Sequence, residues 1–103
     1  MIIAKRCYIG ETIKNKDKIL KTIANNLPLK NIYCLCVGDK PHHLMEILSS
    51  REMIKDIYSK EKYKIIGIAS SRDEAFELTR QIMACVYKEY KDPLKIREFF
   101  ALD

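Results

Sequence analysis

The chain has 103 residues, of which 48% are hydrophobic and 32% charged, and a formal net charge of +5 at pH 7, so we expect a single domain over residues 1–103 with one core. Charged residues interrupt every apolar run before the roughly 18 residues of a membrane span, and the first apolar segment is too short for a secretory signal. This composition excludes a membrane-spanning chain and predicts a cytoplasmic protein without a membrane partner.

The first elements are a strand and a helix. Apolar and polar residues alternate in part over residues 2–9, which include Lys5 and Arg6. This pattern predicts a strand with one face or edge exposed to solvent. A helix of about three turns follows, with Asn15 as a possible cap and Pro28 at its end. Its apolar positions have helical spacing: Ile19, Leu20, Ile23, Ala24 and Leu27.

The segment from Ile32 to Val37 is apolar at every position, which is typical of a strand covered on both faces. We therefore place residues 31–37 at the centre of the sheet. Residues 42–60 fit a helix, although Ser49 and Glu52 have the spacing of a capping box and allow the helix to break and restart there.

The second half predicts one more strand and two helices. Residues 63–69 form a third apolar run. Ser71 and Glu74 have the spacing of another capping box and open a helix that runs to about Tyr90. Pro93 marks its end, and the residues that follow could add one short helix.

This order predicts an α/β fold: a single small layered domain with a three-stranded, largely parallel sheet in the order 1-2-3, three main helices and a short C-terminal helix. Residues 31–37 form its central strand. The alternative is a mixed sheet in which residues 2–9 are an antiparallel edge strand.

The turn after the central strand is the first candidate for chemistry. If the fold is right, it lies at the carboxyl end of a strand, where α/β proteins bind ligands. An anion or phosphoryl group could be held there by side chains and loop amides. The candidate residues of this loop are Cys36, Gly38, Lys40, His42 and His43.

The residues of this loop allow three further interpretations. Cys36 could be a thiolate nucleophile, and Cys34 and Cys36 with the two histidines could bind zinc. The interpretation that we favour is structural, since free cysteine packs well in a two-sided strand and Gly-Asp-Lys-Pro is ordinary turn sequence. We therefore assign no catalytic residue, no metal and no cofactor, and expect the four cysteines to be reduced thiols.

The positive charge is concentrated near the N-terminus. Residues 1–41 contain eight Lys and Arg residues against three acidic ones. Lys14, Lys18 and Lys21 share one face of the first helix and could touch nucleic-acid phosphates. No aromatic stacking residue lies among them, so weak nucleic-acid binding is the third functional hypothesis.

The helix that ends near Tyr90 has more apolar surface than one sheet face can cover. The C-terminal segment could fold back over it, or another subunit could. We predict a homo-oligomer, with a dimer favoured, through Phe76, Met83, Tyr87, Tyr90, Phe99 and Phe100. The leading functional hypothesis is a non-catalytic protein with an adaptor or regulatory role, acting by self-association and partner binding; anion or phosphoryl handling at the Cys36 to His43 loop is the alternative.

Overall fold

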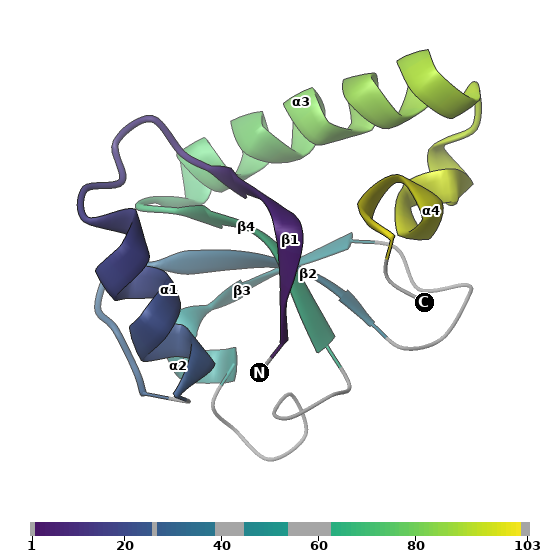
Figure 1. Ribbon diagram of the computed structural model, residues 1–103. Helices are drawn as coiled ribbons and strands as arrows, with labels where there is room; N and C mark the ends of the chain where they lie inside the picture. Colours follow the sequence, from purple (N-terminus) through teal and green to yellow (C-terminus); the bar gives the residue numbers. More distant parts are fainter. Residues whose placement is uncertain (1, 26, 39–44, 54–62, 102–103) are drawn as a thin grey trace.

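The computed structural model describes residues 2–25, 27–38, 45–53 and 63–101 (Figure 1). In chain order, the elements are β1 (Ile2–Ile9), α1 (Lys16–Ala24), β2 (Tyr33–Gly38), β3 (Met45–Ser49), α2 (Ser50–Met53), β4 (Tyr63–Ala69), α3 (Arg72–Tyr90), the 3₁₀ turn η2 (Pro93–Lys95) and α4 (Ile96–Phe100). None of the described helices is long and apolar enough to cross a membrane.

The described strands form one mixed sheet in the order β1-β4-β2-β3. β1 pairs with β4 in parallel, whereas β2 is antiparallel to both β4 and β3. The predicted parallel sheet of three strands in the order 1-2-3 is therefore wrong, because β4 lies between β1 and β2. The alternative is confirmed in that the sheet is mixed and residues 2–9 lie at its edge, but its antiparallel direction for this strand is wrong, because β1 is parallel to β4.

The composition of the strands explains their order. β4 contains Ile65, Ile66 and Ile68, all fully buried, so it needs a strand on each side and a cover on each face. β2 is central, as predicted, and Leu35 and Val37 are also fully buried there. β1 contains two exposed basic residues and lies at an edge, where water solvates their charges.

The segment at residues 45–49 corrects the predicted helix over 42–60. Met45–Ser49 pairs with β2 in antiparallel register, with Ile47 opposite Leu35. The capping box is confirmed: the Ser49 hydroxyl accepts a hydrogen bond from Glu52 N at 3.2 Å and donates one to the Glu52 carboxylate at 3.0 Å. The short helix α2 begins there, and the apolar positions 54, 57 and 58 of the predicted helix lie outside the described residues.

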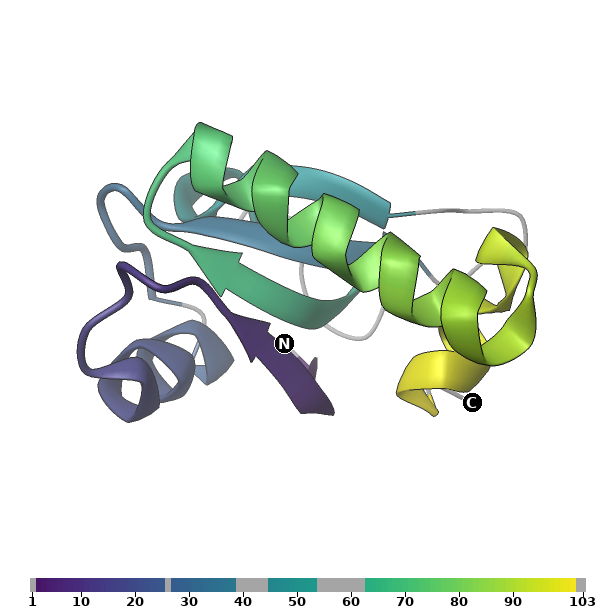
Figure 2. The same cartoon turned by 90° about the horizontal axis from the view of Figure 1, so that it is seen from above.

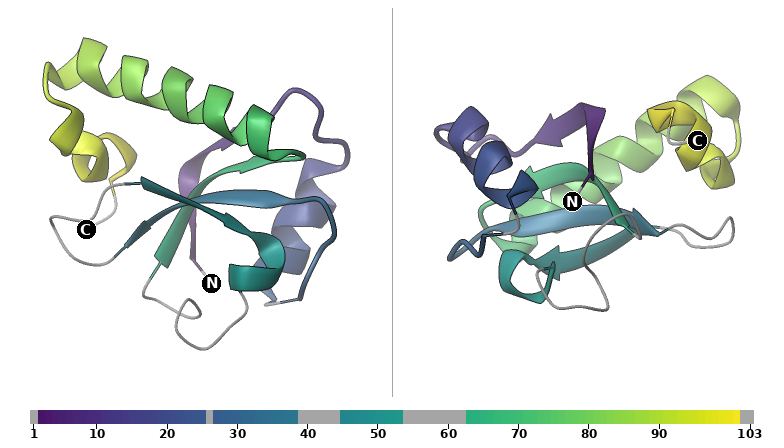
Figure 3. Two further views of the ribbon diagram at one scale, coloured as in Figure 1. Left: turned by 180° about the vertical axis from the view of Figure 1, so that it is seen from behind. Right: turned by 60° about the horizontal axis from the view of Figure 1, so that its bottom comes forward.

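Helices cover both faces of the sheet. α3 runs across one face, and α1 lies on the other (Figures 1 and 2). The view from behind and the tilted view show the same two layers (Figure 3). Alternation along β2 divides its side chains: Leu35 and Val37 face α3, whereas Cys34 and Cys36 join the core cluster that includes Ile23 of α1.

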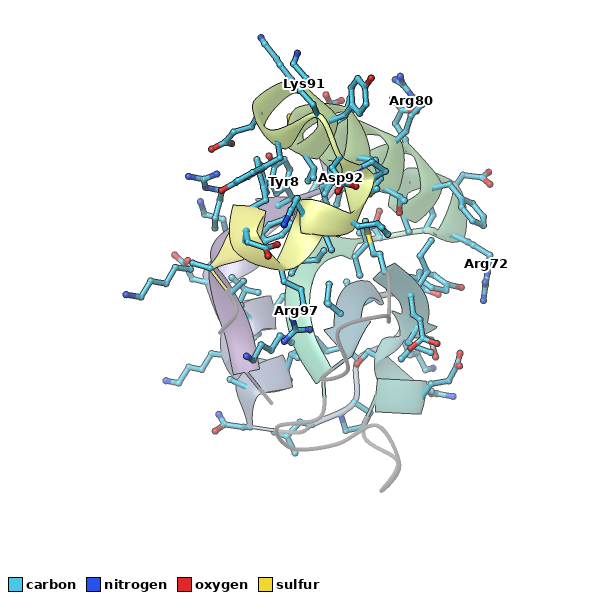
Figure 4. The ribbon with its side chains drawn as sticks, turned by 90° about the vertical axis from the view of Figure 1, so that its right-hand side faces the viewer. Tyr8, Arg72, Arg80, Lys91, Asp92 and Arg97 are labelled. Carbon is cyan, nitrogen blue, oxygen red and sulfur yellow. The ribbon has the colours of Figure 1, made fainter. Side chains whose placement is uncertain are left out.

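The C-terminal segment folds back beneath the end of α3 (Figure 2). Phe99 and Phe100 of α4 are buried, and their rings lie edge to face with a centroid distance of 5.0 Å. Tyr8 of β1 adds a third ring, 5.8 Å from that of Phe100. The Arg97 guanidinium donates a hydrogen bond to the carbonyl of Gly38, which ties α4 to the end of β2 (Figure 4).

Candidate functional site

The two cysteines of β2 are built into the core. Cys34 and Cys36 have no exposed surface. Burial raises the pKa of Cys34 to about 12 and that of Cys36 well above the ordinary value of a thiol. Both side chains are therefore neutral at physiological pH, whereas a cysteine nucleophile reacts as the thiolate. The structure thus supports the packing interpretation of these two residues.

Of the candidate anion-binding loop, the structure describes Cys36 and Gly38; Lys40, His42 and His43 lie outside the described residues. In the part of the chain that is described, no group of three His, Cys, Asp or Glu side chains is arranged to hold a metal ion. Because β2 is antiparallel to β4, Gly38 lies opposite Tyr63, at the start of β4. The carboxyl end of β2 and the amino end of α3 therefore lie at opposite ends of the sheet, and not at the same end as a parallel sheet would place them.

The carboxyl ends that do meet are those of β1 and β4, which are parallel neighbours. Glu74, in the first turn of α3, joins the two loops that follow them. Its carboxylate accepts hydrogen bonds from the backbone N–H groups of Ser70 at 2.9 Å and Thr12 at 3.0 Å. The hydroxyl groups of the same two residues also donate to it, at 2.8 Å for Thr12 and 3.2 Å for Ser70.

This network determines the charge of Glu74. Burial alone would raise the pKa of the carboxyl group, but the hydrogen bonds from Ser70 and Thr12 outweigh it and hold the pKa below its ordinary value. A general acid at neutral pH needs a raised pKa instead. An open hollow of about 400 Å³ lies beside Glu74, and its other charged groups, Glu11, Asp73 and Glu77, are also acidic. We therefore assign Glu74 a structural role: its carboxylate holds the loop that follows β1 against the loop that follows β4.

The residues of the predicted interface fall into two groups. Phe99 and Phe100 are buried in the chain's own core. The C-terminal segment therefore buries its own aromatic residues but does not cover the whole of α3. Three aromatic side chains stay exposed: Phe76 at 55%, Tyr87 at 57% and Tyr90 at 39%. Together with the half-buried Met83, they form what we call the aromatic flank of α3.

The aromatic flank faces the β3 side of the molecule. The Arg72 guanidinium, at the start of this flank, lies 5.4 Å from the centre of the Tyr33 ring in β2. Arg72 and Arg80 both project to the side of α3 opposite Tyr8 (Figure 4). β3 is the edge strand on this side of the sheet. An edge strand and an exposed aromatic stripe thus lie on the same side of the protein.

The lysines near the N-terminus lie in and just before α1, which begins at Lys16, so Lys14 is not on the predicted helical face. Lys14, Lys16, Lys18 and Lys21 are all exposed. The opposite face of this helix packs on the sheet through Ile23, with Ile19 and Leu20 partly buried. A solvated face opposite an apolar stripe is the ordinary arrangement of a surface helix. Nothing else in the described structure adds a recognition element to these lysines.

Fold and site thus define the class of protein: a mixed α/β domain with buried thiols and an exposed aromatic helix flank. Comparisons of the chain with protein-family models, with curated proteins and with solved structures find no match.

Proposed function

We propose that the protein acts by self-association, as a non-catalytic adaptor or regulator, and that two copies pack against each other through the aromatic flank of α3. The observation that carries this proposal is the exposure of Phe76 and Tyr87, each more than half exposed on one side of a single helix. Aromatic residues and methionine are the residue types enriched at protein interfaces.

The aromatic flank is suited to contact with a second copy of the same chain. Phe76 and Tyr90 are each seven residues from Met83, so all three lie in nearly the same direction on the helix. When two α3 helices cross antiparallel about a two-fold axis at Met83, Phe76 of one copy meets Tyr90 of the other. A surface with this spacing is complementary to itself, which a symmetric dimer requires.

Charge is compatible with the same pairing. Arg80 of one copy comes next to Tyr87 of the other, and a guanidinium is attracted to the face of an aromatic ring. Arg80 is held in place within its own helix by an ion pair with Glu77. No pair of like charges is brought together along the Phe76, Met83 and Tyr90 row.

The neighbouring sheet edge supplies further contact area. A stable interface buries about 800 Å² on each partner, more than one helix flank provides. Met45 and Ile47 of β3 are half-buried side chains on the α3 face of the sheet, next to the flank. The backbone of an edge strand offers additional hydrogen-bonding groups to a partner.

The test is sedimentation equilibrium over a hundredfold range of protein concentration. The wild type should approach twice the chain mass of 12.1 kDa as its concentration rises. In the variant Phe76→Ser with Tyr87→Ser, the dimer dissociation constant should rise at least a hundredfold, because both copies lose these side chains and an aromatic hot spot contributes about 2 kcal/mol or more.

Leu27→Ser is the matched control, since Leu27 is 54% exposed and lies outside the flank. Its dimer should be unchanged, and circular dichroism should show that all variants are folded. Phe100 is not a suitable position for the test, because it is buried in the core and a charge there would report on folding. A wild type that stays at 12.1 kDa at every concentration would refute self-association.

A further inference from the structure

The opposite flank of α3 borders an open hollow of about 460 Å³. Three elements that are distant in the sequence build it: β1, the last turns of α3, and α4. Its lining residues are Arg6, Tyr8, Cys85, Lys88, Glu89 and Phe99. Its volume is within the range of small-molecule sites in proteins, which is about 300–1,000 Å³.

The floor of the hollow is aromatic and well supported. The ring of Phe99 is 6.5 Å from that of Tyr8, and both contact Phe100 beneath them. Phe99 is only 8% exposed, so its position is set by the core. The aromatic floor is therefore already in place before a ligand binds.

Two basic side chains line the hollow. The Arg6 guanidinium lies 4.9 Å from the centre of the Phe99 ring, which holds it over the floor. Lys88 approaches from α3. Glu89 is the one carboxylate among the described lining residues, and neither Arg6 nor Lys88 forms an ion pair within 4.0 Å with a described acidic group. The described lining residues thus have an excess of positive charge.

Tyr8 and Cys85 provide neutral polar groups between the floor and the cations. Burial, together with a hydrogen bond to the Cys85 thiol, raises the pKa of Tyr8, so its hydroxyl stays protonated and can donate. Of the four cysteines, all of which the structure describes, Cys85 is the exposed one. Its thiol can therefore report whether the hollow is occupied.

We propose that this hollow binds a small organic anion with a flat apolar body. The body lies against the Tyr8 ring, beside the Arg6 guanidinium that lies over Phe99, and the acidic group faces the Arg6 guanidinium and the Lys88 ammonium. Arginine suits this position, because its planar group offers paired N–H donors to a carboxylate, sulfonate or phosphate. The charge selects anions, and the aromatic floor selects flat molecules over simple inorganic ions.

Two naphthalene dyes of nearly the same shape test the proposal: 8-anilinonaphthalene-1-sulfonate, which is an anion, and N-phenyl-1-naphthylamine, which is neutral. The readout is the rate at which iodoacetamide alkylates Cys85, followed by mass spectrometry of the intact protein and its peptides. The sulfonate dye should slow this alkylation at least fivefold at saturation. The neutral dye at the same concentration should have little effect.

Variants separate the hollow from other apolar surfaces. In Arg6→Gln with Lys88→Gln, the dissociation constant of the sulfonate dye, measured by protection of Cys85, should rise at least tenfold. Arg80→Gln is the matched control, because it removes a cation from the opposite side of α3 and should leave protection unchanged. Circular dichroism confirms that each variant is folded.

Three results would overturn the proposal: no protection of Cys85 by the sulfonate dye, equal protection by the neutral dye, or unchanged protection in the Arg6 and Lys88 variant. Each is independent of the proposed self-association. The hollow and the aromatic flank lie on opposite sides of α3, and Phe76→Ser with Tyr87→Ser should leave dye binding intact. Loss of the dimer and loss of the anion site are therefore distinguishable.

Discussion

The carboxylate of Glu74 lies so close to the backbone of Gly10 that a Cβ atom at Gly10 would clash with the Glu74 Oε1 atom. Gly10 also donates its N–H to the carbonyl of Ile68, so it is held at the junction of β1 and β4. The glycine is required here for close approach and not for an unusual backbone angle. Glu74 therefore fits its four hydrogen bonds only because position 10 has no side chain.

Replacing Gly10 with alanine should lower the free energy of unfolding by about 1–3 kcal/mol, the usual cost of overpacking. The added methyl group displaces the Glu74 carboxylate from Thr12 and Ser70. Urea denaturation of Gly10→Ala, Glu74→Ala and the double variant measures this coupling. The penalty of Gly10→Ala should largely disappear when Glu74 is already alanine; an equal penalty in both backgrounds would contradict this account.

Glu74 should also make stability depend on pH in the acid range. Its pKa is lowered in the folded protein, so the carboxylate stabilises the fold above the ordinary glutamate pKa of about 4.3. That contribution is lost as the pH falls through the lower pKa of the folded state. Glu74→Gln should be less stable than the wild type at pH 7, and the difference should shrink on acidification from about pH 5 to pH 3. A difference that stays constant over this range would show that the charge of Glu74 is not involved.

Leu35, at the centre of β2, is fully buried beneath α3. Leu35→Ala should lower the free energy of unfolding by about 2–5 kcal/mol, because it leaves a cavity in the core. Leu27→Ala is the control for the same chemical change at an exposed site, and it should stay within about 0.5 kcal/mol of the wild type. Chemical denaturation compares the two, and similar values for both would argue against the central position of β2.

The four thiols should react at very different rates. Cys85 is exposed, whereas burial raises the pKa of Cys7, like that of Cys34, to about 12. Ellman's reagent should titrate one thiol rapidly in the native protein and all four in denaturant. Cys85→Ser should abolish the rapid phase. A rapid phase that persisted in this variant would show that a β1 or β2 thiol is accessible.

The predicted site and interface show where local reasoning fails. The sheet is predicted to be largely parallel from the order of its elements, but β2 runs antiparallel to β4, so the carboxyl end of β2 and the amino end of α3 lie at opposite ends of the sheet. Phe99 and Phe100 were grouped with the exposed aromatics because sequence cannot tell an end that folds back from one that meets a partner. The hollow was not predicted, since Arg6, Cys85 and Phe99 come together only in the folded chain.

The sequence by itself determined the local elements. Residues 63–69 form the predicted strand, and the strand predicted over residues 31–37 is found at residues 33–38. α3 begins at the Ser71 cap, whose hydroxyl accepts a hydrogen bond from the Glu74 N–H at 3.1 Å. Apolar periodicity and capping act over a few residues, so these features can be read from neighbouring positions. The tertiary structure alone decided the strand order, the direction of β2, the strand at Met45–Ser49 and the flank of α3 that stays exposed. Each of these depends on hydrogen bonds and packing between segments far apart in the chain. A local sequence pattern does not contain this information; that of residues 45–49, for example, fits a helix or a strand equally well.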